Sequence, residues 1–271
     1  RAMRCNERAV GFAGMKDKEA VTAQWFSVHT PNEAPTDPKI GEGVEILDVS
    51  RHTNKIRRGH LRGNEFTIKL RDIDPVHAPR VLRLLRLLAA QGVPDYFGAQ
   101  RFGYRANNHL LGRSLLRSDW QGLLDELLGS RGSAFPEHQR ERREQYDAGH
   151  YRDALNAWGR RDRQERLALG QLVAGHPPER ACRALGERML EFWLNAAQSA
   201  IFNRLLDRRL EAGLLGQLLV GDLAWKHDSR AVFRVDASEV DTAGFHDRLR
   251  RLEISPSGPL WGADMMLAEG D

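Results

Sequence analysis

The feature that most restricts the fold is a long helical pattern from Glu179 to Ala212, which Pro177 and Pro178 open. Proline suits the first turn of a helix because its ring fixes φ and its missing N–H would have no partner there. Apolar side chains recur at helical spacing, so one face is expected to pack against the rest of a domain. We therefore expect residues 119–271 to be mostly helical. Within them, the mixed charges from His138 to Glu144 are typical of a solvated helix face.

Residues 1–118 follow a different pattern. Within residues 1–30 we expect two strands joined by a tight turn, and alternation at Val44–Val49 and Glu65–Leu70 indicates further strands. From Pro75 to Gln91, apolar side chains at helical spacing predict an amphipathic helix packed into the core. The chain is therefore predicted to be α+β, with a mixed or antiparallel sheet in residues 1–118 and a domain boundary near residue 118.

The charge balance gives only a weak indication of partners. The chain has 41 Lys and Arg against 37 Asp and Glu, a net charge of +4, which slightly favours a polyanionic partner. The distribution is more informative, because arginines cluster in residues 51–71, 101–117 and 140–166. Cys5 and Cys182 lie far apart, which argues against a disulfide scaffold and suits a reducing cytoplasm. No apolar run approaches the length of a membrane span, so no membrane association is expected.

One carboxylate is a candidate for chemistry. It lies in the stretch Gly11–Trp25, which reads GFAGMKDKEAVTAQW. Asp17 stands between Lys16 and Lys18, and neighbouring cations favour the ionised form of a carboxyl group. An ionised carboxylate can act as a nucleophile or a base. The alternative is a solvated charged turn without a chemical role, which is the usual interpretation of an isolated Lys-Asp-Lys.

A basic segment follows in residues 51–66, with β-type residues between its cations. We expect an antiparallel hairpin there, and one interpretation is that its cationic side chains bind the phosphate backbone of RNA. The candidate side chains are Arg51, Lys55, Arg57, Arg58 and Arg62. Charged side chains also protect sheet edges from aggregation, and the pattern alone favours neither interpretation.

A glycine-rich aromatic stretch, Gly92–Gly103, reads GVPDYFGAQRFG. Glycine lets a backbone approach a ligand closely, and a flat ring such as that of Phe97 can stack on a nucleic-acid base. Arg101 lies between the aromatic residues. The alternative is a set of aromatic side chains buried in a core.

Three polar side chains in the long helical pattern have a different expected role. Asn195, Gln198 and Asn203 are spaced to hold neighbouring backbone groups through hydrogen bonds. We therefore assign them to the structure and not to the chemistry.

Four segments together resemble the TruD family of tRNA pseudouridine synthases. They are the Gly-x-Lys-Asp turn, the Arg-His-x-x-Lys segment that begins at Arg51, the Tyr-Phe-Gly-x-Gln-Arg-Phe-Gly run after Asp95, and the helical run Phe192–Asn203. The resemblance implies part of a pseudouridine synthase catalytic domain in residues 1–118 and a TRUD-type insertion domain in residues 119–271. It also implies that further segments of the catalytic domain precede and follow this stretch.

The resemblance implies a reaction as well, the isomerisation of uridine-13 of tRNA to pseudouridine without a cofactor or a metal. In this interpretation the target base swings out of the RNA, Asp17 is the nucleophile and Phe97 contacts the base. Lys16 and Arg101 assist substrate binding. Asp95 stands where the family has an asparagine, and a carboxylate lacks the donor that an amide offers. Asp95 could instead pair with an arginine such as Arg101.

The expected enzyme is a cytoplasmic monomer whose partner is tRNA, with no protein partner. One alternative is a non-catalytic RNA-binding module on the same fold. The intact Gly-Met-Lys-Asp-Lys run argues against that alternative, since a pure binder needs no carboxylate facing a phosphate backbone. Another alternative is a pseudouridine synthase that acts on a different RNA, and the sequence does not separate it from the first interpretation.

Overall fold

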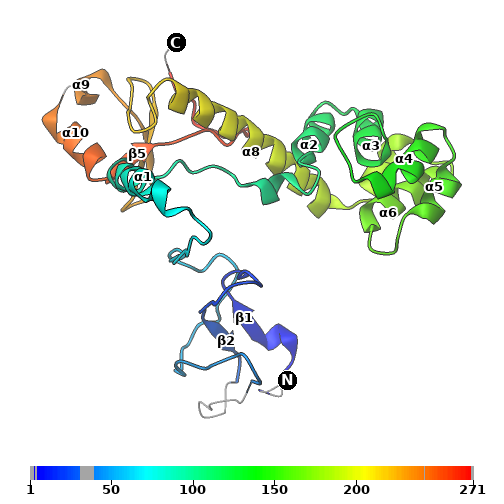
Figure 1. The fold of residues 1–271 in the computed structure, drawn as a ribbon, viewed down its shortest axis with the longest axis horizontal. Helices are drawn as coiled ribbons and strands as arrows, with labels where there is room; N and C mark the ends of the chain where they lie inside the picture. The colour runs from blue at the N-terminus through cyan, green and yellow to red at the C-terminus, as the bar shows by residue number, and fades with distance from the viewer. Residues whose placement is uncertain (1–2, 4, 31–39, 241, 270–271) are drawn as a thin grey trace. The chain divides into compact units, whose positions relative to one another are not determined.

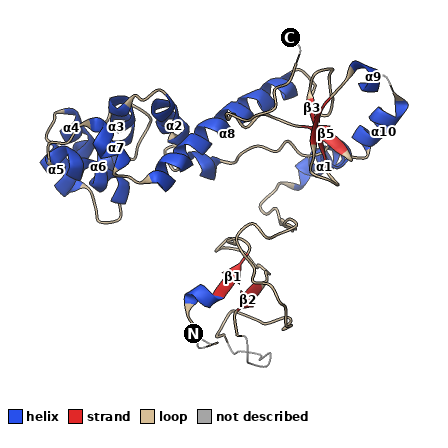
Figure 2. Ribbon diagram, turned by 180° about the vertical axis from the view of Figure 1, so that it is seen from behind, coloured by secondary structure: helices blue, strands red, loops and turns tan. Residues whose placement is uncertain are grey.

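The structure of the chain, a computed structural model, describes residues 3, 5–30, 40–240 and 242–269. Its contacts divide it into two compact units, Arg1–Ile73 and Asp74–Asp271 (Figure 1). The predicted α+β class is confirmed, because helices occur together with small antiparallel sheets (Figure 2). The predicted boundary near residue 118 separates a catalytic part from an insertion domain, and the division by contacts does not test it. It stays a prediction.

The first unit is built on a two-stranded antiparallel sheet. The 3₁₀-helix η1 (Glu7–Ala9) leads into β1 (Val10–Phe12), which pairs with β2 (Phe26–Val28). The side chain of Asn6 caps η1 by accepting a hydrogen bond from the N–H of Arg8. The register places Val10 opposite Val28 and Phe12 opposite Phe26. The loop between the two strands therefore runs from residue 13 to residue 25.

Several predictions for this unit are wrong. The predicted tight turn is a long loop, residues 13–25, and the described residues form no strand at 44–49 or 65–70 and no hairpin at 51–66. Alternating side chains make a strand only where a neighbouring strand accepts and donates the ladder hydrogen bonds. All side chains of residues 65–70 are exposed, and no described strand pairs with this segment.

The second unit begins with the 3₁₀-helix η2 (Pro75–His77), capped by Asp74, and α1 (Ala78–Gln91). The helix is confirmed, but the prediction that it packs into the core is wrong. None of its side chains is buried, and Leu84 and Leu85 are 54% and 53% exposed. An amphipathic face is buried only where another element covers it, and the described elements leave this face open.

A bundle of helices follows the 3₁₀-helix η3 (Ala99–Phe102). Its members are α2 (Asn108–Leu116), α3 (Trp120–Leu128), η4 (Glu137–Gln139), α4 (Arg140–Asp147), α5 (Tyr151–Ala157), α6 (Arg163–Val173), α7 (Pro178–Arg183) and α8 (Glu187–Glu211). The long helical pattern of the sequence is therefore split into α7 and α8. Gly186, which directly precedes α8, adopts a φ of 90°, a conformation that favours glycine.

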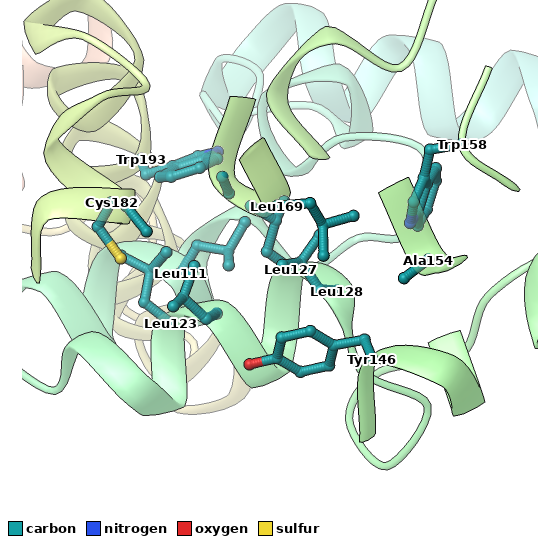
Figure 3. Close-up of a cluster of buried hydrophobic side chains, with 13 residues drawn as sticks. Leu111, Leu123, Leu127, Leu128, Tyr146, Ala154, Trp158, Leu169, Cys182 and Trp193 are labelled. Carbon is teal, nitrogen blue, oxygen red and sulfur yellow. The ribbon is translucent and has the colours of Figure 1, made fainter. Parts of the chain in front are cut away.

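The core of the bundle is a cluster of apolar side chains from α2 to α8 (Figure 3). Leu123, Leu124 and Leu128 from α3 are fully buried. The cluster also includes the buried side chains of Trp158 and Trp193. The charged run in α4 was predicted to be a solvated face. That prediction is wrong for Arg143, which is also fully buried and stacks on the rings of Trp158 and Phe135.

The end of the unit is a three-stranded antiparallel sheet of order β4-β3-β5, made by Leu223–Lys226 (β3), Val232–Arg234 (β4) and Ile254–Pro256 (β5). Two helices, α9 (Ala237–Val240) and α10 (Ala243–Arg250), connect β4 to β5. Phe245 and Ile254 lie in a second small core. The ion pair of Arg209 with Asp222, at 2.9 Å, ties the end of α8 to the start of β3. No helix in the described ranges has the length and apolar character needed to cross a membrane.

Candidate functional site

The candidate nucleophile lies on the loop that follows β1. Asp17 is exposed, as are Lys16 and Lys18 on either side of it. Lys16 is held in place, because its Nζ donates a 2.9 Å hydrogen bond to Oδ1 of Asn64. The structure thus presents a carboxylate to solvent beside a cation that a distant segment fixes.

The basic segment lies along β1 in an irregular, extended path. Gly11 makes this path possible, since a Cβ there would lie 2.1 Å from the carbonyl oxygen of Ile56. The N–H of Ile56 donates to Oγ of Ser27 at 2.9 Å, and the N–H of Gly59 donates to the carbonyl of Ala13 at 2.8 Å. These isolated bonds replace the predicted hairpin ladder and bring the segment to the loop that carries the candidate nucleophile.

All five predicted RNA-backbone cations are exposed. Arg58 lies over the ring of Phe12, 5.6 Å from its centroid. Lys55 donates to the carbonyl of Arg8, and Arg51 donates to the carbonyl of Thr30 at 3.4 Å.

Two members of the set have a different environment. Arg57 and Arg62 are exposed, and within the described residues their side chains make no hydrogen bond or ion pair. Their guanidinium groups are thus the members of this set that an anion can reach without displacing a contact described here.

The aromatic candidate lies in the second unit, in the loop between α1 and η3. Phe97 is half-buried, and its ring meets that of Phe202 edge-on, with centroids 5.4 Å apart. Arg101 lies over the Phe97 ring at 5.5 Å and over the Phe192 ring at 5.9 Å. The structure therefore brings Arg101 over the ring of Phe97, a residue that remains partly exposed.

The same loop is bonded to α8. The side chain of Asn203 accepts a hydrogen bond from the N–H of Phe97 and donates one to its carbonyl, each at 2.9 Å. Tyr96 donates to Oδ1 of Asp207 at 2.8 Å, and this bond raises the pKa of the tyrosine. Gln198 donates to the carbonyl of Trp261.

The structural role assigned to polar side chains of α8 is thereby confirmed for Asn203 and Gln198. Asn195 is exposed, and its side chain makes no hydrogen bond within the part of the chain that the structure describes. Asp95 is exposed too, and the described residues include no ion pair between it and Arg101, which instead contacts the aromatic rings. The suggested pairing of Asp95 with Arg101 is therefore wrong for this arrangement.

The sequence pattern does not reveal the partners that hold these groups. Asn64 anchors Lys16 across 48 positions, and Asp207 anchors Tyr96 across 111. Pattern and spacing report contacts within one element, whereas these contacts join distant segments. Asn64 lies inside the family-like basic segment, and this position was the only indication in the sequence that it has a role at the site.

A hollow of about 530 Å³ lies elsewhere in the second unit, between α3, α4 and α5. Its lining includes Asp125, Tyr146 and Asp147 but none of the predicted site residues. Tyr146 donates to Asp125 at 2.7 Å, and burial together with this bond raises the pKa of the tyrosine. In the described ranges no three His, Cys, Asp or Glu side chains converge as a metal site, and the expectation of a reaction without metal stays a prediction.

Comparison with known proteins identifies the family. The profile described as tRNA pseudouridine synthase D (TruD) matches residues 1–271. A tRNA pseudouridine synthase D of Geobacter sulfurreducens is 39% identical over 273 residues, which is all of this chain and 65% of that protein. One of Syntrophotalea carbinolica is 38% identical over 99% of this chain and 66% of its own length. The chain thus spans just under two thirds of these relatives.

The fold supports the same assignment. A crystal structure described as that of a candidate tRNA pseudouridine synthase D (TruD) from Methanosarcina mazei matches with a TM-score of 0.80 and 26% identity. The match covers 99% of this chain and 64% of that one. The profile, the relatives and the fold agree, and the chain belongs to the tRNA pseudouridine synthase D (TruD) family.

Proposed function

We propose that the protein is a pseudouridine synthase that isomerises uridine in tRNA, at uridine-13. The observation that carries the proposal is the exposed Asp17 carboxylate on the loop after β1, in a chain that matches the family from end to end. The relatives that are 38% and 39% identical to this chain are named tRNA pseudouridine synthase D, which supports the choice of tRNA as substrate.

In the proposed reaction Asp17 attacks the target nucleotide covalently, at the ribose C1′ or at C6 of the base. The N1–C1′ bond breaks, the uracil rotates, and a C5–C1′ bond forms. The proton on C5 leaves, N1 takes up a proton, and release of the carboxylate restores the enzyme. Substrate and product are isomers, so the balance needs no oxidant, reductant or cofactor. Lys16, fixed by Asn64, supplies positive charge beside the nucleophile.

The target base must leave the RNA stack before it can react, at a cost of a few kcal/mol. Stacking on the accessible part of the Phe97 ring would return about 1–3 kcal/mol. Arg101 is placed over that ring and supplies a cation for the same nucleotide. Asp95 is exposed near this ring in sequence, and we assign it a substrate contact in place of the asparagine of the family.

The basic segment would bind the RNA backbone. Arg51, Lys55 and Arg58 are held by contacts within the first unit, and Arg57 and Arg62 extend into solvent. Cations that neutralise phosphates release counterions, which makes such binding strong at low salt and weak at high salt. The proposal includes a monomer that acts in the cytoplasm, where the free thiols of Cys5 and Cys182 would persist.

The test is the replacement of Asp17 in the full-length protein. Asp17→Asn and Asp17→Ala should abolish pseudouridine formation on a tRNA transcript and leave tRNA affinity within a few-fold of the parent, because the charge and not the binding surface is lost. Asp48→Asn, the same change at an exposed carboxylate of the same unit, is the control and should retain activity.

Substantial turnover by either Asp17 variant would remove that residue from the nucleophile role. A parent protein that binds tRNA without forming pseudouridine in any RNA would favour the RNA-binding module. Pseudouridine formed only in another RNA would favour the synthase of different specificity.

A further inference from the structure

The loop that carries Phe97 has few restraints of its own. Gly92 and Gly103 adopt φ values of 85° and 79°, which favour glycine, and glycine allows many backbone conformations. Between these two positions only the short η3 is regular. A loop of this kind holds an aromatic ring in one position only if other elements fix it.

A short stretch of α8, residues 202–207, holds the loop in place. Phe202 contacts the Phe97 ring edge-on, Asn203 bonds to the Phe97 backbone, and Asp207 accepts from the Tyr96 hydroxyl. Asn203 and Asp207 are four apart on the helix and so share one face, and Phe202 is the neighbour of Asn203; all three side chains contact the same loop.

The bonds of Asn203 are the most specific of these contacts. Its amide pairs with both the N–H and the C=O of Phe97, at 2.9 Å each, as an antiparallel strand partner would. Only a primary amide offers a donor and an acceptor in this arrangement, because a carboxylate has no donor and an aliphatic side chain has neither. The two bonds restrict both φ and ψ of Phe97 and thereby the direction of its ring.

The helix surface that receives Phe97 is itself fixed. A Cβ at Gly258 would lie 2.4 Å from the Phe202 ring, so the loop after β5 passes directly against that ring. Gln198, one helical turn before Phe202, donates to the carbonyl of Trp261 in the same loop. The Phe202 ring that contacts Phe97 is therefore itself held in place by the loop after β5.

We propose that Asn203 is a positioning residue for the base-contacting Phe97, an inference that rests on the proposed function. Asn203 does not touch the reacting atoms. It acts by holding the peptide unit of Phe97, so that the ring is already oriented when the target base arrives. A base that stacks on an oriented ring does not pay the entropy of ordering the loop.

The experiment is a double-mutant cycle in the full-length protein, with kcat/KM measured for pseudouridine formation on a tRNA transcript. The variants are Asn203→Ala, Phe97→Ala and the pair, with Asn195→Ala as a matched control on the exposed side of the same helix. Phe97→Ala is expected to lower kcat/KM by about 5- to 150-fold, the range for loss of one stacked base. Asn203→Ala should lose no more than that, and the pair should be no slower than Phe97→Ala alone, because both changes remove the same oriented ring.

Two outcomes would overturn the proposal: an Asn203→Ala variant with the activity of the parent, or losses that multiply in the pair, as separate structural damage would produce. If Asn203→Ala does not fold, Asn203→Asp replaces it in the cycle, since it keeps the acceptor for the Phe97 N–H and loses the donor to its carbonyl. The hydrogen-exchange rate of the Phe97 amide is a second measurement, which does not depend on catalytic activity. Faster exchange in Asn203→Ala than in Asn195→Ala supports the clamp, and equal exchange contradicts it. A parent protein that forms no pseudouridine would refute the proposed function and leave this exchange comparison intact.

Discussion

Arg143 shows how a single residue in a charged run can be part of a core. Its guanidinium is fully buried and donates to Oε1 of Gln139 and to the carbonyls of Leu127 and Gly129, at 2.8 to 3.1 Å. Burial lowers the pKa of Arg143 to about 10, so the side chain stays protonated at neutral pH. The alternation of charges in α4 predicted a solvated face, because sequence spacing does not reveal carbonyls at the end of another helix.

Those acceptors make Arg143 important for stability. Arg143→Ala removes the donor to the carbonyl of Gly129 and leaves the carbonyl of Leu127 with only the 3.4 Å bond from Arg105, and it should lower the free energy of unfolding by about 3 kcal/mol. Arg140→Ala is the control on the same helix, because its ion pair with Glu137 is exposed to solvent and should contribute much less to stability. Denaturant unfolding of both variants checks the prediction, and equal losses would contradict it.

His109 gives a prediction about pH. Burial, then the charge of Arg113, lowers its pKa below 6.5, and Glu126 opposes the shift only in part. The unfolded chain therefore binds a proton more readily, so the stability contributed by neutral His109 should fall as pH drops below about 6.5. His109→Gln should reduce this pH dependence, measured as the unfolding midpoint between pH 5 and 7, whereas a change at the exposed His150 should not. The same dependence in both variants would be evidence against a role for His109.

At the scale of elements, α2 and α8 pack closely because of one glycine. A Cβ at Gly112 would lie 2.0 Å from the carbonyl oxygen of Trp193 and 3.0 Å from the Cβ of Ala197. The sequence pattern identified both helices but not their contact, since a glycine at a helix interface looks like any other glycine until its neighbour is known.

The prediction for this contact compares two glycines within helices. Gly112→Ala should destabilise the bundle by about 1–3 kcal/mol, because the added methyl group forces the helices apart. Gly170→Ala in α6 meets no atom within 4 Å and should stabilise by about 0.4–1 kcal/mol, through the lower entropy of the unfolded chain. Thermal unfolding of the two variants measures the difference, and shifts of the same sign would contradict the close approach seen here.

The conformation of the basic segment, residues 51–66, was predicted wrongly from its sequence. Its β-type residues suggested a hairpin, yet the backbone bonds of Ile56 and Gly59 go singly to Ser27 and Ala13. Alternation is a local property, and whether a ladder forms depends on a partner edge that the local pattern does not specify.

This segment also carries a prediction about salt. Replacing Arg57 and Arg62 by Ala should weaken binding to all RNAs alike and flatten the slope of log affinity against log salt by about 0.9 per lost phosphate contact, or about 0.7 for single strands. Arg160→Ala with Arg161→Ala, two exposed arginines of the other unit, is the charge-matched control. Equal slopes for the parent and the Arg57/Arg62 variant would show that these two arginines do not contact RNA phosphates.

At the scale of the whole molecule, the sequence predicted the α+β class and four family-like segments, and the family is confirmed over residues 1–271. The long-range partners of the candidate site, such as Asn64 for Lys16, could not be predicted, because they depend on how distant segments meet.

The central claim is that the protein forms pseudouridine in tRNA through Asp17, and one measurement tests it most directly. Pseudouridines are mapped by sequencing in the RNA of cells that lack the full-length protein, and again after return of the parent or of Asp17→Asn. We predict that one tRNA position, uridine-13, loses its modification in the deletion, regains it with the parent, and stays unmodified with Asp17→Asn. An unchanged map in the deletion, or full restoration by Asp17→Asn, would contradict the account.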